Sequence, residues 1–293
     1  MFYLELFING LLVGMLYALI ALGFVLIYKA SDVINFAQGE LVMFAGFVLA
    51  ASLQEYGLPL VWAIAAGLAA MIVLGYLVER IVLQHLVGQP VVSVIMATIG
   101  LAAFLQGLAL FIWGPGTRNL PLPVPSEPVY VGEILLSQIQ IYSAILALLC
   151  IAVFGLFFTK SRMGIALRAI ADDQQVSMAM GINVKLYFAM AWAIAGIVAA
   201  VGGIVWGHML GVDVQLALVG LKVFPVVILG GLDSIVGAVV GGMIIGVVES
   251  MAAGFIDPLV GGGTKDFTPY VLMILVLMFR PYGLFGKEII ERV

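Results

Sequence analysis

The chain has 293 residues, of which 64% are hydrophobic and only 10% are charged, and its formal net charge at pH 7 is −4. Because roughly a quarter of the residues in a soluble domain are charged, this composition excludes an ordinary water-soluble fold and predicts an integral membrane protein. The basic residues are spread along the chain, which argues against a nucleic-acid footprint, and the single cysteine, Cys150, excludes an internal disulfide and a cysteine-based metal site.

The first apolar run, residues 6–28, contains no charged residue and is long enough to cross about 30 Å of hydrocarbon. No basic residue precedes it, so we interpret it as a retained span and not as a cleaved signal peptide. Further runs of spanning length are predicted at residues 34–53, 57–78, 91–113, 134–159 and 186–210. None alternates with a period of two, so helices are expected and not the strands of a membrane barrel.

The second predicted span begins with the polar residues Asn35, Gln38 and Glu40. Asn35 and Gln38 are three positions apart, so on a helix they would share a face and could line a wet translocation path or gate. The alternative, that these side chains satisfy backbone groups where the chain enters the membrane, stays open. Thr98 and Gln106 in the fourth span are further candidates for the path, although such uncharged residues mostly bond to neighbouring helices.

Two loops differ in composition. Residues 114–138 contain five prolines, which fix φ and remove backbone donors, so we expect an extended external loop without helix. Residues 161–185 are charged and free of proline, and they predict a short cytoplasmic helix that ends at Gly181. From chemistry alone, this second segment is either a solvated loop or a lever that transmits force between two spans.

The carboxyl-terminal third contains charged residues within apolar runs. Residues 214–232 include Lys222 and Pro225, and residues 234–256 include Glu249, so both segments are candidates for broken or re-entrant helices. A last span is expected at about residues 268–285. The sequence thus predicts an all-α, polytopic transmembrane helix bundle of eight or nine spans, formed by a single domain over residues 1–293.

Orientation follows from the basic residues, because lysines and arginines near span ends are retained in the cytoplasm. If residues 161–185 are cytoplasmic, nine of the twelve basic residues share that side: Lys29, Arg80, Lys160, Arg162, Arg168, Lys185, Arg280, Lys287 and Arg292. The nine-span alternative then places the amino terminus outside and the carboxyl terminus inside.

Glycines recur at the spacing that allows close helix contact, for example Gly10 with Gly14 and Gly242 with Gly246. Packing within the bundle and self-association are both open explanations. A weak internal duplication is also suggested, because INFAQGE at residues 34–40 and LGGLDS at residues 229–234 each follow a broken apolar span.

Catalytic and metal-binding patterns are missing from the sequence. No nucleophile with a base and oxyanion donors is visible, and GGGTKD at residues 261–266 lacks the spacing of a phosphate-binding loop. His85 and His208 have no further histidine or cysteine at metal-ligand spacing. We therefore expect a chain that is not an enzyme, binds no metal or cofactor and does not hydrolyse ATP by itself.

Five stretches occur in order along almost the whole chain: NGLLVGMLYALIALGFVLIY, INFAQGE, SRMGIALRAIADD, MGIN and LGGLDSIVGAVVGG. In these stretches the chain resembles the LivH-type permeases of branched-chain amino acid ABC transporters. The resemblance implies an ABC importer permease fold and an import function for leucine, isoleucine and valine or related small polar substrates. Permeases for urea, amides and aromatic acids belong to the same family and are the alternative.

The resemblance also implies partners: a second homologous permease, two cytoplasmic ATP-binding subunits that carry ATP and magnesium, and a periplasmic or extracellular substrate-binding protein. It implies a place in the bacterial inner membrane and makes residues 161–184 the coupling loop that docks on an ATPase. This loop departs from the Glu-Ala-Ala pattern of many importer permeases, so the resemblance assigns the coupling role to the segment as a whole. Within the segment, the residues that the resemblance assigns to coupling are Arg162, Gly164, Arg168, Asp172, Asp173 and Gly181.

Three rival functions remain. A secondary transporter would need carboxylates at mid-membrane depth, and Glu249 alone gives it thin support. A membrane-embedded enzyme lacks a paired catalytic constellation, and a passive channel would conduct without partners.

Overall fold

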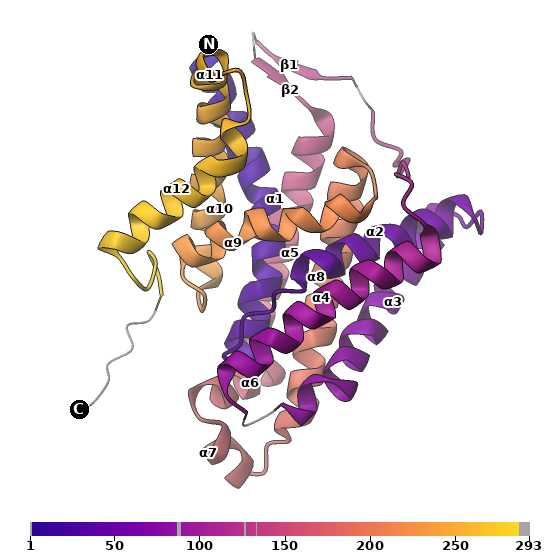
Figure 1. Cartoon of the computed structure of the whole chain (residues 1–293), viewed down its shortest axis with the longest axis vertical. Coiled ribbons are helices and arrows are strands. Elements are labelled where there is room, and N and C mark those ends of the chain that lie inside the picture. The colour runs from indigo at the N-terminus through magenta and orange to yellow at the C-terminus, as the bar shows by residue number, and fades with distance from the viewer. Residues whose placement is uncertain (1, 87–88, 126, 133, 287–293) are drawn as a thin grey trace. The chain divides into compact units, whose positions relative to one another are not determined.

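The computed structural model describes residues 2–86, 89–125, 127–132 and 134–286, and nearly all regular structure in these ranges is helical (Figure 1). The chain divides into two compact units. Unit 1 comprises Met1–Val25, Pro123–Ala152 and Lys222–Val293, and unit 2 comprises Leu26–Leu122 and Val153–Leu221. The predicted all-α helix bundle is confirmed. That residues 1–293 form a single permease domain stays a prediction.

Unit 1 contains the larger part of α1 (Phe2–Ser31), a small β-hairpin, the first part of α5 (Gln138–Lys160) and the carboxyl-terminal helices. These are most of α9 (Leu218–Gly230), then α10 (Ile235–Phe255), α11 (Asp257–Val260) and α12 (Thr264–Phe279). The last helix is shorter than the predicted span and ends before Arg280, whose φ of −135° and ψ of 82° leave the helical region.

The described part of the predicted loop at residues 114–138 contains no helix before Gln138, as expected, but it includes a small hairpin. Strand β1 (Val129–Val131) pairs antiparallel with β2 (Ile134–Leu136), with Val129 opposite Leu136. Valine, tyrosine and isoleucine favour strands, and Gly132 adopts a φ of 66° in the turn. Residues 134–136, which the sequence assigned to a span, are therefore drawn into the hairpin, and α5 begins only at Gln138.

Close contact between α1 and α10 holds unit 1 together. A Cβ atom placed on Gly14 would lie 2.5 Å from the carbonyl oxygen of Gly242, and one on Gly246 would lie 2.3 Å from that of Gly10. No side chain fits between these backbones, so van der Waals packing replaces the hydrophobic effect that is absent in lipid. These glycines therefore serve packing within the chain, which is one of the two explanations that the sequence left open.

Unit 2 contains the remaining helices. They are the end of α1, then α2 (Gln38–Gln54), α3 (Leu60–Ile81), the 3-10 turn η1 (Leu83–His85), α4 (Val91–Trp113), the end of α5, α6 (Arg162–Asp172), α7 (Gln174–Ala179), α8 (Val184–Leu210), the 3-10 turn η2 (Val214–Ala217) and the first turn of α9. The predicted and observed bounds of α4 coincide.

Helices α3 and α8 lie against each other along much of their length. A Cβ atom placed on Gly75 would lie 2.4 Å from the carbonyl oxygen of Trp192, and one on Gly196 would lie 2.4 Å from that of Met71. Gly203 on α8 approaches Val42 on α2 in the same way, at 2.6 Å. Helix α8 is thus the central element of unit 2, and α2 and α3 pack against it.

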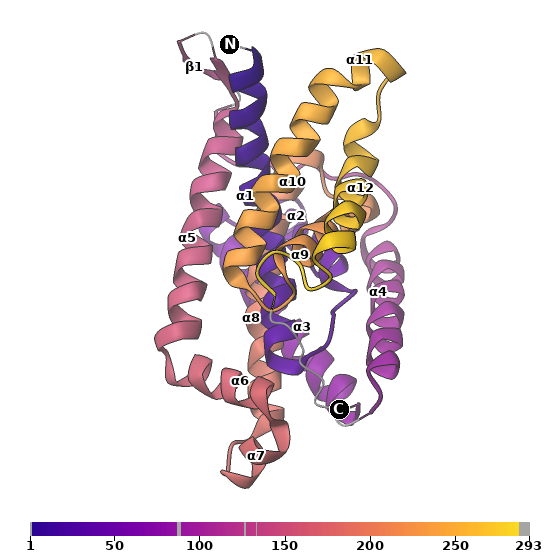
Figure 2. The ribbon, with the colours of Figure 1, turned by 90° about the vertical axis from the view of Figure 1, so that its left-hand side faces the viewer.

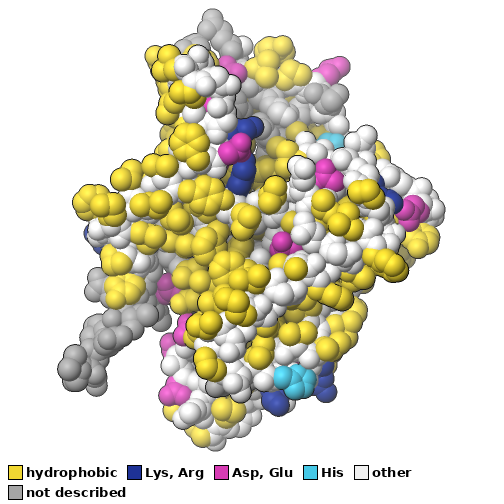
Figure 3. All heavy atoms as spheres, viewed as in Figure 1, with side chains coloured by type: hydrophobic (Ala, Val, Ile, Leu, Met, Phe, Trp, Pro, Cys, Tyr) yellow, Lys and Arg dark blue, Asp and Glu magenta, His cyan; other side chains and the backbone are white. Residues whose placement is uncertain are grey.

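Six helices in the described ranges are long and apolar enough to cross a membrane: Phe2–Ser31, Leu60–His85, Val91–Trp113, Gln138–Lys160, Val184–Leu210 and Ile235–Phe255. Hydrophobic side chains are spread widely over the face drawn in Figure 3. Helix α9 has 13 residues and contains Pro225, so it is too short to span and fits the predicted broken helix. The count of eight or nine spans stays a prediction.

Candidate translocation and coupling sites

The segment between α1 and α2 is an irregular turn that the side chain of Asn35 organises. Its Oδ1 accepts a hydrogen bond from the backbone N–H of Ala37 at 3.0 Å, and its Nδ2 donates to Gln38 Oε1 at 3.2 Å. Both side chains are completely buried. The predicted shared helix face is wrong, because Asn35 precedes the helix and bonds locally to the backbone, as asparagine does in turns.

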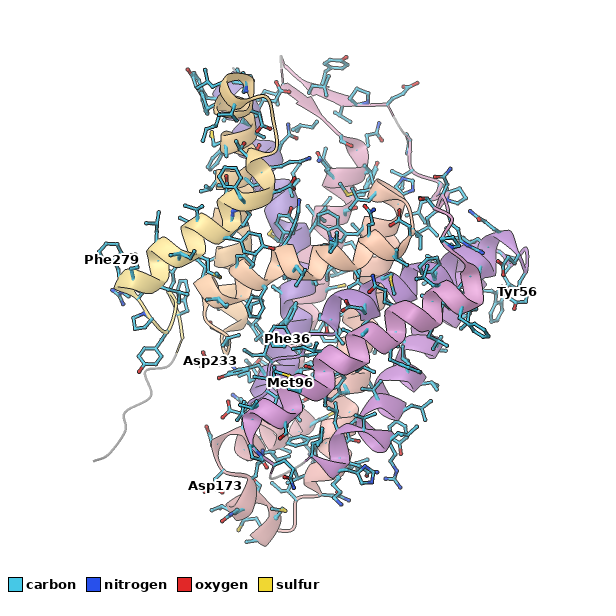
Figure 4. The ribbon with its side chains drawn as sticks, viewed as in Figure 1. Phe36, Tyr56, Met96, Asp173, Asp233 and Phe279 are labelled. Atoms are coloured by element: carbon cyan, nitrogen blue, oxygen red, sulfur yellow. The ribbon has the colours of Figure 1, made fainter. Side chains whose placement is uncertain are left out.

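Thr98 on α4, which is far from this turn in the sequence, forms a hydrogen bond with it. Its Oγ1 accepts a hydrogen bond from the backbone N–H of Phe36 at 3.4 Å and donates one to the carbonyl oxygen of Ile95 at 2.9 Å. Figure 4 labels Phe36 in this turn and Met96 on α4, two residues before Thr98. Asn35, Gln38 and Thr98 therefore form one buried polar group, which we call the α2 entry cluster.

Within the α2 entry cluster, Gln38 keeps a spare donor. Its Nε2 is buried and has no hydrogen-bond partner in the described part of the chain. A buried N–H group without a partner costs about 1–3 kcal/mol, so such a group is retained only where something else compensates. It is the atom of the cluster that is available to a water or a passing ligand.

The other two candidates for the path lie apart from the α2 entry cluster. Glu40 is half-buried in the first turn of α2, where a negative charge is favourable at the helix amino terminus. Gln106 is exposed on α4, about 12 Å along the helix from Thr98 at 1.5 Å per residue. The structure therefore unites three of the five candidate residues.

The sequence did not identify the contact that covers the start of α2. A Cβ atom placed on Gly39 would lie 2.2 Å from the carbonyl oxygen of Ala217, and one on Gly220 would lie 2.5 Å from Gly39 Cα. The first turn of α2 therefore approaches η2 and the first turn of α9 closely at Gly39, which meets Ala217 and Gly220.

The turn from α5 into α6 is tightly fixed, and Figure 2 shows the chain changing direction sharply there. Ser161 Oγ accepts a hydrogen bond from the backbone N–H of Gly164 at 2.9 Å and so caps α6. A Cβ atom on Gly164 would lie 2.5 Å from the carbonyl oxygen of Phe158, so glycine is required there. Arg168 Nη2 donates to the carbonyl oxygen of Thr159 at 3.2 Å and ties α6 to the end of α5.

Asp173 interrupts the segment, so the predicted single helix is wrong. Its φ of −158° and ψ of 111° are extended, and its Oδ1 accepts a hydrogen bond from the backbone N–H of Val176 at 2.9 Å. Asp173 thereby ends α6 and caps α7, which is the usual use of aspartate at a helix start. Gly181, with a φ of 83°, then ends the segment, and a left-handed φ favours glycine there.

The α6–α7 segment has one buried and one exposed side. Ile170 packs with Val184 and Phe188 of α8. On the other side Arg162, Asp172 and Asp173 are exposed, and Met180 is 79% exposed. Figure 4 labels Asp173 on this segment. The segment is thus anchored to unit 2 and presents a mixed apolar and charged surface.

A charged cluster in unit 1 supplies the partners of Glu249 that the sequence could not identify. Glu249 on α10 is 7% exposed, and Lys222 Nζ lies 3.9 Å from its Oε1. Lys222 also forms an ion pair with Asp266 of α12 at 2.6 Å. The hydroxyl of Tyr17 on α1 bonds to the Glu249 carboxyl group. Within the described ranges, no three His, Cys, Asp or Glu residues gather as metal ligands would.

Comparison with known proteins adds a family match. The family model described as "Branched-chain amino acid transport system / permease component" matches residues 6–277. The high-affinity branched-chain amino acid transport system permease protein BraD of Pseudomonas aeruginosa is 32% identical, over 99% of this chain and 98% of the relative. The corresponding permease protein LivH of Escherichia coli K12 is 30% identical, over 100% of this chain and 98% of the relative.

Among solved structures, "PsaBC from Streptococcus pneumoniae in complex with Fab" aligns with 92% of this chain and 90% of that chain. Its sequence identity is 14% and its TM-score is 0.46, a likeness too distant for residue-by-residue transfer.

Proposed function

The chain belongs to the family of branched-chain amino acid transport permeases, and from this premise we propose which cargo it carries and which residues take part. It is the membrane permease subunit of an ABC importer. We assign leucine, isoleucine and valine as its cargo. The observation that carries this assignment is the match along essentially the full length to two relatives named for these amino acids.

The proposed assembly contains a second homologous permease, two cytoplasmic ATP-binding subunits and an external substrate-binding protein. ATP and magnesium belong to the ATP-binding subunits, and this chain binds no cofactor and does not hydrolyse ATP. The assembly lies in the bacterial inner membrane, with the carboxyl terminus of this chain in the cytoplasm. Lys29, Arg80, Lys160 and Lys185 lie at helix ends, as expected for the side that retains basic residues; Lys287 and Arg292 are outside the described residues.

The α6–α7 segment is proposed as the coupling element that docks on an ATP-binding subunit. The segment exposes a methionine, Met180, as well as Arg162 and Asp172, which is the apolar and charged mixture that protein interfaces use. Arg168 and Ile170 fasten the segment to α5 and α8. A push on this surface would therefore be transmitted into unit 2 and not absorbed by a loose loop.

The α2 entry cluster is proposed as part of the translocation path. It is polar, completely buried and carries the unpaired Gln38 Nε2, which can donate to a polar group of the cargo. Transport then follows alternating access: ATP closes the ATP-binding subunits, the docked segments move, and the path opens to the other side.

The test is uptake of radiolabelled leucine into proteoliposomes that contain the complete assembly. Uptake should require ATP, both ATP-binding subunits and the binding protein, and excess isoleucine or valine should compete. Competition by urea, an amide or an aromatic acid instead would favour those cargoes. ATP-independent uptake by this chain alone would favour a secondary transporter, and cross-linking that placed residues 161–184 outside would refute the coupling role.

A further inference from the structure

Unit 2 contains a pocket of about 270 Å³ that has no role in the function proposed above. Its wall comes from the end of α1, the end of α3 with η1, the start of α4, α7 and the first half of α8. Ligand pockets in proteins hold about 300–1,000 Å³, and this one lies just below that range, so it suits a ligand of only a few heavy atoms.

The acidic side chain of Glu79 is the unusual member of this wall. Its exposed fraction is 2%, and its Oε1 has no hydrogen-bond partner in the described part of the chain. Arg80 and Lys185 are near enough to act on its charge, yet neither forms an ion pair with it among the described residues, and neither lines the pocket. A buried carboxylate oxygen without a hydrogen-bond partner is costly, and a cation in the pocket would reduce that cost.

The remaining lining restricts the kind of cation. Phe188 and Trp192 present aromatic rings and Leu83 and Leu86 present aliphatic surface, whereas Asp32 and Gln89 add polar groups. A metal ion prefers several hard oxygen ligands, and no group of three or more candidate ligands occurs in the described ranges. An organic ammonium satisfies both features, because it pairs with a carboxylate, is attracted to aromatic faces and carries its own apolar body.

We propose that this pocket is a binding site for a primary ammonium group attached to a compact apolar body, with Glu79 as the counter-ion. The ammonium lies at the Glu79 carboxylate, and the apolar body lies against Phe188 and Trp192. A soluble alkylamine carries both parts, and the ethanolamine headgroup of a lipid shares the primary ammonium.

The position of Gln174 connects the site to the coupling element. Gln174 belongs to α7 and lines the pocket together with Glu79 of α3 and Trp192 of α8. An occupant would therefore touch α7 and the body of unit 2 at once and restrain the movement of α7. This one consequence rests on the proposed coupling role of the α6–α7 segment, whereas the binding site itself does not.

The binding test uses the full-length chain in phosphatidylcholine nanodiscs and radiolabelled 3-methylbutylamine as the probe. The amine should bind saturably, and 4-methylpentanoate, which has the apolar body but a carboxylate, should not compete. Glu79→Gln keeps the size and removes the charge, so affinity should fall by about tenfold or more. Val94→Trp fills the pocket while leaving Glu79 in place and should abolish binding.

Glu249→Gln is the matched control, because it changes another buried carboxylate that does not line the pocket. It should bind the amine as the parent chain does. Competition by phosphatidylethanolamine in the nanodisc would identify a lipid headgroup as the ligand, and lack of competition would identify a soluble amine. Both outcomes support the ammonium site.

The proposal is overturned if the parent chain does not bind the amine, if a correctly folded Glu79→Gln chain binds it unchanged, or if the carboxylate competes equally. Because this assay needs neither ATP nor partner subunits, its failure is separate from failure of leucine uptake by the assembly. In the assembly, the amine should slow ATP hydrolysis in the parent and not in Val94→Trp.

Discussion

Asn35 donates a side-chain hydrogen bond to Gln38 Oε1 at 3.2 Å, and both side chains are completely buried. Because the other end of the same amide accepts from the backbone of Ala37, one side chain closes the turn and orients the first residue of α2. The geometry of the proposed path thus depends on Asn35, and the position of the spare Gln38 donor depends on it as well.

Asn35→Ala should therefore reduce both stability and uptake. The backbone N–H of Ala37 and the side chain of Gln38 both lose a partner in a buried place, which costs about 1–3 kcal/mol. Thermal unfolding and leucine uptake measure the two effects. Gln106→Ala is the control, because Gln106 is exposed on α4 and its loss should change stability by less than about 0.5 kcal/mol. Equal losses in the two variants would argue against a special role for the α2 entry cluster.

Gly14→Ala should destabilise unit 1, because the added methyl group would lie 2.5 Å from the carbonyl oxygen of Gly242 and force α1 away from α10. Such overpacking costs about 1–3 kcal/mol. Gly100→Ala on α4 makes the same chemical change where the added methyl group would meet no described atom within 4 Å beyond its own stretch of helix, so it should be neutral or stabilising by about 0.5–1 kcal/mol. The difference between their melting temperatures tests the contact, and similar melting temperatures would contradict it.

Some elements could be predicted from sequence because their signals are local. The bounds of α4 follow from Pro90 before the apolar run and Gly114 after it. The break at Asp173 could not be predicted, because the residues on both sides favour helix and only the side-chain cap on Val176 decides the outcome. A helical period suggested that Asn35 and Gln38 meet, but a turn brings them together.

Contacts between residues that are far apart in the sequence could not be predicted. Nothing local connects Lys222 with Glu249 or Asp266, because three separate helices bring them together. Glu79 went unnoticed because a carboxylate beside Arg80 at a span end resembles an ordinary interfacial charge, and only the fold shows that it is buried beside a pocket.

Lys222→Met should destabilise the chain more than Glu249→Gln. Loss of the ammonium leaves the buried Glu249 carboxylate without its counter-ion, at a cost of about 1–3 kcal/mol given the partial exposure of Lys222. Glu249→Gln removes the charge and still offers an acceptor to Tyr17, so the melting temperature should change little. A larger loss in Glu249→Gln would show that the carboxylate itself, and not its pairing, is required.

The connection between α11 and α12 should weaken in acid. The Thr264 hydroxyl donates to Asp257 Oδ1, and the backbone N–H of Thr264 donates to the same oxygen at 2.8 Å, which together lower the pKa of Asp257 below its usual 3.8. Because the pKa is lower in the folded chain, the stabilisation is present above the usual value and is lost as the pH falls through the lowered one.

Asp257→Asn should therefore lower the melting temperature near neutral pH, and the difference from the parent should disappear in strong acid. Thr264→Val, which lacks the hydroxyl donor, should move the onset of this loss toward the usual pKa of aspartate. A difference in melting temperature that does not depend on pH would contradict a role for the charge of Asp257.

Arg168→Ala should uncouple the assembly without preventing insertion of the chain. Arg168 fastens α6 to the carbonyl oxygen of Thr159, so its loss lets the segment move without carrying α5 with it. Stimulation of ATP hydrolysis by ligand-loaded binding protein should fall by about fivefold or more, the range typical of a coupling free energy.

Asp172→Ala should reduce stimulation through the exposed surface, whereas Lys160→Ala removes an exposed charge just before the segment and should leave stimulation unchanged. Because the Arg168 bond is internal to this chain and Asp172 is exposed, only Asp172→Ala should also weaken cross-linking to the ATP-binding subunit. Unchanged stimulation in both variants would remove these residues from the coupling role.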